Sequence, residues 1–161
     1  MDYKTELSKA MKMLAENEQV IFIGQGVIHP DVTPLFDTLR DVPLAKRIEL
    51  PVTENTQMGM SIGLALQGFI PISIYPRMDF LLLAFDQLIN HLDKFEELSH
   101  GEFKPKVIIR TSIGATKPLN PGPQHCQNHT GMLIEGLTNI DVMELTKPEH
   151  IMAAYLGALS N

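Results

Sequence analysis

The sequence has one cysteine, no tryptophan and no apolar run approaching the roughly 20 residues of a membrane span. A single cysteine, Cys126, cannot form a disulfide within the chain, which favours a cytoplasmic location. No basic segment followed by an apolar segment opens the chain, so we expect no signal peptide. The net charge of -6, without a stripe of Lys and Arg, argues against nucleic-acid binding.

Several common catalytic and nucleotide-binding motifs are also missing. The chain has no Walker-type phosphate loop, and Gly24-Gln25-Gly26 fails the dinucleotide fingerprint because His29 occupies the position of its third glycine. No GxSxG sequence, which would indicate an α/β-hydrolase nucleophile, occurs. His125, Cys126 and His129 lack further ligands at zinc-site spacing, so we expect no metal to be held by this chain.

Helical and strand patterns alternate along the 161 residues, a length that suits one domain. Apolar periodicity predicts helices over residues 3–15, 31–40, 54–67, 79–98, 129–135 and 148–159. Short β-branched runs predict strands over residues 20–23, 47–50, 71–75, 106–110 and 141–145. The alternation indicates a layered α/β fold with a mostly parallel sheet, and Asp79 is expected to cap the helix that it begins.

Glu54 is the leading candidate for proton chemistry. It begins a helix with an apolar, small-residue body, and desolvation beside apolar surface favours the neutral form of a carboxyl group. The alternative is that Glu54 only complements the helix dipole. Because ligands of parallel sheets lie beyond the carboxyl ends of the strands, Glu54, Phe80 and His125 are expected to converge on one rim.

The order of several motifs resembles a known enzyme family. Glu54 is followed by a small-residue helix, then by Asp79-Phe80, Asp86-Gln87-Leu88-Ile89-Asn90 and Gln124-His125. This succession, over roughly residues 15–157, resembles the pyrimidine-binding domain of thiamine diphosphate enzymes, most closely the beta subunit of the 2-oxoacid dehydrogenase decarboxylase component. The resemblance implies a three-layer α/β sandwich, with residues 1–161 as one domain and the C-terminal domain of relatives absent.

The resemblance also assigns roles to individual residues. Glu54 corresponds to the glutamate that bonds N1′ of the cofactor pyrimidine and promotes loss of the thiazolium C2 proton, and His125 corresponds to a residue near the substrate. Val52 and Phe80 match positions that wall the pyrimidine, although Phe80 would also suit a plain core position. Arg77 stands where many relatives carry an aromatic residue, and stacking on the pyrimidine, binding an anionic substrate and facing solvent are all open to it.

A partner chain is implied as well. The family holds magnesium and the cofactor diphosphate through a GDG…N motif, which this sequence lacks, so an alpha-type chain is expected to supply both in a homo- or hetero-oligomer. The implied activity is decarboxylation of a 2-oxoacid with acyl or aldehyde transfer. Two alternatives are a split transketolase or deoxyxylulose-phosphate synthase subunit, and a non-catalytic descendant that serves binding or assembly.

Overall fold

A parallel four-stranded sheet forms the centre of the computed structural model, which describes residues 2–29 and 37–161. Its strands are β1 (Val20–Gly24), β2 (Arg47–Glu49), β3 (Ile70–Ile74) and β4 (Ile108–Arg110), arranged in the order β2-β1-β3-β4. Every neighbouring pair runs parallel, so the carboxyl ends of all these strands lie at one edge of the sheet. The expected α/β class with a parallel sheet is confirmed.

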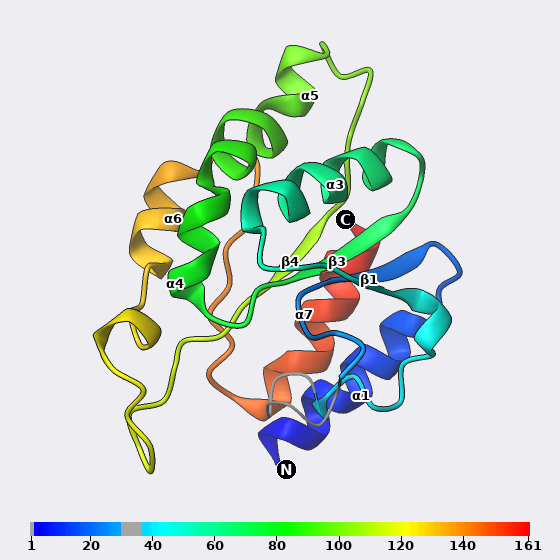
Figure 1. The fold of residues 1–161 in the computed structure, drawn as a ribbon. Helices are drawn as coiled ribbons and strands as arrows, with labels where there is room; N and C mark the ends of the chain where they lie inside the picture. Colours follow the sequence, from blue (N-terminus) through cyan, green and yellow to red (C-terminus); the bar gives the residue numbers. More distant parts are fainter. Residues whose placement is uncertain (1, 30–36) are drawn as a thin grey trace.

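Helices cover both faces of the sheet and complete three layers (Figure 1). Helices α1 (Tyr3–Ala15) and α7 (Pro148–Ser160) pack together on one face. The other face carries α3 (Glu54–Leu66), the helical segment that begins with α4 (Met78–Leu81), and α6 (Thr130–Gly136). Short 3-10 turns also occur at η1 (Leu44–Lys46) and η5 (Pro123–His125).

Two apolar clusters fill the spaces between these layers. On β3, Ile70, Ile72 and Ile74 point to the cluster beneath α1 and α7, because alternate residues of a strand face the same side. The second cluster lies around α3 and includes Met58 and Tyr75. A sheet with both faces covered requires nearly continuous apolar strands, which explains the short apolar runs of the sequence.

The predicted regular helix over residues 79–98 is wrong in detail. The chain is helical there but changes type, from α4 through η2 (Leu82–Ala84), the π-helical η3 (Asp86–His91) and η4 (Leu92–Lys94) to α5 (Phe95–Leu98). Asp79 does not cap it, because Arg77 occupies the cap position and Asp79 lies inside the first turn. The Asp79 carboxylate instead accepts hydrogen bonds from Gln127, a distant residue that no local pattern reveals.

The strand predicted over residues 141–145 is also wrong, since this segment is irregular and joins no ladder. Val142 packs against one apolar cluster and Leu145 against the other, so both are partly buried without strand pairing, whereas Met143 is exposed. A groove of about 920 Å³ is lined by residues of this segment, of β4 and of neighbouring helices. Of the helix predicted over residues 31–40, positions 30–36 lie outside the described residues, Asp37 is helical and residues 38–40 form a turn.

The other predicted elements are confirmed to within two residues at each end. Within the described ranges, none of the helices combines the length and the apolar character needed to cross a membrane.

Candidate functional site

Glu54 lies at the carboxyl edge of the sheet as the first residue of α3. The hydroxyl of Tyr75, the residue directly after β3, donates a hydrogen bond to the main-chain oxygen of Glu54 at 3.3 Å. Burial raises the pKa of Tyr75, so this phenol stays a neutral donor. The Glu54 side chain is half-buried and makes no hydrogen bond or ion pair with the described residues, so its carboxylate is available to a ligand.

Gln57 fixes the first turn of α3 against the sheet. Its buried amide nitrogen donates to the Ile74 carbonyl at 3.0 Å and to the Ser73 hydroxyl at 3.1 Å. Ser61, one turn later, donates to the Gln57 carbonyl at 2.8 Å. Sequence reasoning missed this contact; the signal for it was the pair of polar residues four apart in an otherwise apolar helix. The bonds hold the turn that presents Glu54.

Phe80 and His125 form the closest aromatic contact of the site. Their ring centroids lie 5.4 Å apart with an interplanar angle of 86°, an edge-to-face arrangement. The main chain of His125 also packs against Gly114, where a β-carbon would come within 1.8 Å of the His125 carbonyl oxygen. The loop after β4 therefore folds back on its own beginning and brings His125 to α4.

Val52 and Arg77 take no part in the ring pair. The Val52 side chain is 67% exposed. Arg77 is half-buried, and its guanidinium lies 3.4 Å from the Ser112 hydroxyl, at the start of the loop after β4. A cofactor-binding role for either residue stays a prediction.

The structure thus joins two of the three residues expected at the rim. Phe80 and His125 are in direct contact, whereas Glu54 lies on the same edge of the sheet beside Tyr75, with no hydrogen bond to that pair. The catalytic roles of Glu54 and His125 stay predictions. In the part of the chain that the structure describes, no three His, Cys, Asp or Glu side chains are grouped so that they could hold a metal ion.

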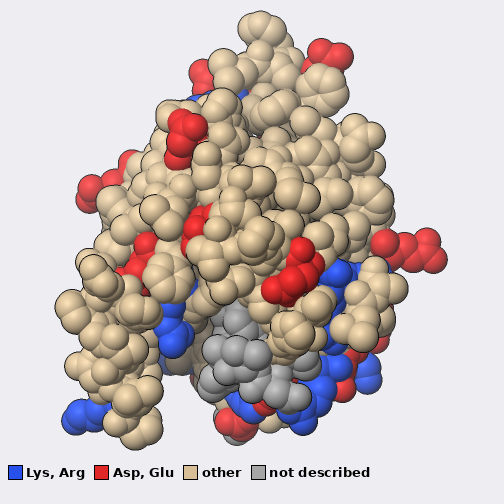
Figure 2. Space-filling model, in the orientation of Figure 1, with Lys and Arg blue, Asp and Glu red and all other residues tan. Residues whose placement is uncertain are grey.

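The surface over α3 carries few charges. Figure 2 shows a broad uncharged area there, with Lys and Arg gathered in the lower part of the view. Met60 on α3 is 40% exposed and Leu83 on η2 is 63% exposed, so apolar side chains from both elements reach solvent. Met58, by contrast, is wholly buried because it faces the apolar cluster beneath α3.

Comparisons with known proteins show that parts of the chain are similar to beta subunits of 2-oxoacid dehydrogenases. No family model matches it. The pyruvate dehydrogenase E1 component subunit beta of Cyanidium caldarium is 40% identical over 110 residues, which are 66% of this chain and 33% of that protein. The 3-methyl-2-oxobutanoate dehydrogenase subunit beta of Mycobacterium tuberculosis is 30% identical over 126 residues, covering 74% of this chain and 36% of that protein.

A third relative, the pyruvate dehydrogenase E1 component subunit beta of Gracilaria tenuistipitata var. liui, is 39% identical over 80 residues, which are 50% of this chain and 24% of that protein. The chain therefore spans about a quarter to a third of the length of the curated relatives it matches.

Proposed function

The chain is homologous to beta subunits of 2-oxoacid dehydrogenases over the matched segments, and from this homology we propose that it is the pyrimidine-binding part of a thiamine diphosphate-dependent, decarboxylating 2-oxoacid dehydrogenase. Residues 1–161 would act as one pyrimidine-binding domain. The observation that carries the proposal is the open carboxylate of Glu54 at the same sheet edge as the Phe80–His125 pair.

The described residues fit a bound pyrimidine. Glu54 would share a proton with the pyrimidine ring. The hydrogen bond from the Tyr75 hydroxyl holds the main chain of Glu54 in place. Phe80 and Val52 would supply apolar walls, with Arg77 beside them, and His125 would orient the substrate or transfer a proton to it. Thiamine diphosphate, when bound, supplies a thiazolium ring that stores the electrons released by decarboxylation.

A second chain would complete the site. Magnesium and the cofactor diphosphate need oxygen ligands, and no group of three or more acidic or other metal-binding side chains is present among the described residues. An alpha-type partner with a GDG…N motif would supply them in a hetero-oligomer. The exposed Met60 and Leu83 give this chain an apolar surface near the site that suits such a partner.

The proposed substrate is a 2-oxoacid, the class shared by the names of the relatives, one of which specifies pyruvate and another 3-methyl-2-oxobutanoate. These names favour a dehydrogenase over a split transketolase. A cytoplasmic location is proposed from the single cysteine.

Reconstitution with an alpha-type chain tests the proposal. We expect the isolated chain to bind thiamine diphosphate more weakly than about 1 μM by calorimetry, and the complex to bind it tightly and decarboxylate a 2-oxoacid. Micromolar or tighter binding without a partner contradicts the divided site. A stable complex that never decarboxylates a 2-oxoacid favours the non-catalytic assembly role.

Glu54→Gln tests the proposed acid within that complex. It should abolish exchange of the cofactor C2 proton while leaving the fold intact, because the amide cannot give up or take a proton. Glu149→Gln, an exposed change in the first turn of α7 on the opposite face of the sheet, is the matched control. Exchange in Glu54→Gln as fast as in the control would exclude Glu54 as the activating group.

A further inference from the structure

Three successive residues of α4 hold the loop that carries His125. The ring of Phe80 meets the ring of His125. Asp79 accepts hydrogen bonds from Gln127 through one carboxylate oxygen, Oδ1, at 3.3 Å from the main-chain nitrogen and 2.8 Å from the side-chain amide. The main-chain N–H of His129 points to the Met78 sulfur at 3.0 Å. Residues 78, 79 and 80 thus contact residues 129, 127 and 125, in reverse order.

The Asp79 contact is the strongest polar one of the three. A carboxylate that accepts two N–H groups forms charge-assisted bonds, which are roughly twice as strong as neutral ones. Asp79 is 9% exposed, so little water competes for Gln127. Its other oxygen, Oδ2, is buried and has no hydrogen-bond partner among the described residues. The carboxylate therefore acts on the loop through Oδ1 alone.

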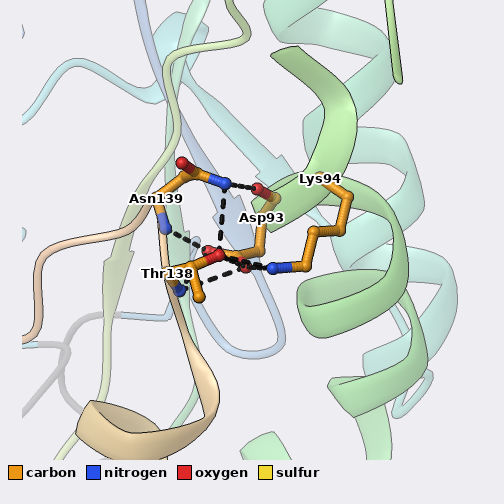
Figure 3. Close-up of polar contacts among 4 residues, drawn as sticks. All are labelled: Asp93, Lys94, Thr138 and Asn139. Carbon is orange, nitrogen blue, oxygen red and sulfur yellow. Dashed lines mark hydrogen bonds and ion pairs between the residues drawn. The ribbon is translucent and has the colours of Figure 1, made fainter. Parts of the chain in front are cut away.

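A second aspartate anchors the far end of the same segment (Figure 3). Asp93 accepts the main-chain N–H groups of Thr138 at 3.1 Å and Asn139 at 2.8 Å, and it pairs with Lys94 at 2.7 Å. Asp93 is almost completely buried on η4. The irregular helical segment 78–98 therefore contacts the stretch 125–139 near both of its own ends. Only the contact at Asp79 lies next to a residue of the proposed site.

We propose that Asp79 is a positioning residue, whose carboxylate fixes Gln127 and so holds His125 edge-on to Phe80. The consequence for catalysis rests on the proposed function, whereas the consequence for the loop does not. Because only Oδ1 is engaged, Asp79→Asn keeps an acceptor oxygen in place and should preserve the loop, while Asp79→Ala removes the acceptor and should release it. Asp93→Asn weakens the other anchor and serves as the matched control.

The first experiment uses the full chain alone. Hydrogen exchange followed by mass spectrometry reports the protection of residues 122–129 and 137–140, and NMR reports the His125 ring protons, whose shifts depend on the facing Phe80 ring. Asp79→Ala should speed exchange at residues 122–129 about tenfold or more and move the His125 signals toward those of a free imidazole. Asp79→Asn should stay within about threefold of the parent chain.

The control variant should change exchange at the other anchor, away from His125. Asp93→Asn should speed exchange at residues 137–140 and leave the His125 signals in place. If Asp79→Ala folds poorly, Gln127→Ala tests the same contact from the exposed side, because it removes the shorter of the two bonds without opening a cavity in the core. Unchanged exchange and unchanged His125 signals in both Asp79→Ala and Gln127→Ala would overturn the proposal.

The second experiment uses the reconstituted complex. Asp79→Ala should lower kcat about tenfold or more with a smaller change in KM, Asp79→Asn should restore most of kcat, and Asp93→Asn should stay within about twofold of the parent enzyme. Equal losses in Asp79→Ala and Asp93→Asn would reduce Asp79 to a general stability role and overturn the positioning claim. If no complex turns over a 2-oxoacid, the proposed function fails, while the exchange and NMR results still decide whether Asp79 fixes the loop.

Discussion

The absence of one side chain shapes the site at the scale of single residues. Gly114 lies against the carbonyl oxygen of His125, and no β-carbon fits between them. The requirement here is for close approach of two chain segments rather than for an unusual backbone angle. The ring of Phe80 contacts the His125 ring from α4, and Gly114, in the loop after β4, lies against the main chain of His125, so two separate parts of the fold hold this residue.

Gly114→Ala should therefore push the His125 loop away. We expect a loss of about 1–3 kcal/mol in the free energy of unfolding, because the added methyl group overlaps main-chain atoms that cannot move freely. Gly157→Ala is the control, since a β-carbon there meets nothing within 4 Å and alanine favours a helix by up to about 1 kcal/mol. Urea denaturation measures both, and equal stability of the two variants would show that the loop tolerates a side chain at position 114.

At the scale of elements, the segment 78–98 is an irregular helical support for other parts of the chain. It changes from α to 3-10 to π geometry along its length, and Asp79 near its start and Asp93 near its end both contact the stretch 125–139. π-helical turns are rare and often occur at functional sites. Gln57 supports α3 in a similar way, because its side-chain amide joins the first turn of α3 to the end of β3. Each support is a buried polar contact between segments distant in sequence.

The pH dependence of stability should reveal the Asp93 anchor. Burial acts to raise the pKa of Asp93, but the Lys94 ammonium and the donors of Asn139 and Thr138 outweigh it and hold that pKa below its ordinary value of 3.8. The unfolded chain then binds the proton more readily, so the stabilisation is present above pH 3.8 and is lost as the pH falls through the folded-state pKa.

Asp93→Asn should cost about 1–3 kcal/mol near pH 7, and the difference from the parent chain should shrink below about pH 4. Urea denaturation across this range measures the difference. Asp141→Asn, on an exposed segment, should show no such trend. A gap between Asp93→Asn and the parent chain that stays constant from pH 7 to pH 3 would contradict the lowered pKa.

At the scale of the whole molecule, the two faces of the sandwich differ. On the α1–α7 face the two helices pack over one apolar cluster, with Leu156 exposed, whereas the opposite face exposes Met60 on α3 and Leu83 on η2, and the surface over α3 is poor in charge (Figure 2). Exposed apolar side chains beside the proposed site are typical of a surface that another subunit covers.

Leu83→Glu should weaken binding of the proposed alpha-type partner by about 100-fold, because the interface would have to bury an unpaired carboxylate. Leu156→Glu, at an exposed leucine on α7, is the control for the opposite face and should bind as the parent chain does. Calorimetry or surface plasmon resonance with the partner measures both. Equal affinities for the two variants would place the partner elsewhere.

The sequence by itself determined the layered α/β fold and the order of most elements. The spacing of apolar residues and the runs of β-branched residues are local features of the sequence. They therefore predict α1, β1, α3 and β3 almost to the residue. The order of the motifs also predicted Glu54, Phe80 and His125 as site residues. The similarity to beta subunits of 2-oxoacid dehydrogenases supports the resemblance on which that prediction rests.

Only the tertiary structure decided which residues meet. The Asp79–Gln127 bonds, the close approach of Gly114 to His125 and the buried Gln57 contacts join segments between 11 and 48 residues apart, where local patterns carry no information. For the same reason Asp79 resembled a helix cap and residues 141–145 resembled a strand. A carboxylate or a β-branched run has several ways to satisfy its bonds and its burial, and the choice depends on what the rest of the fold brings beside it.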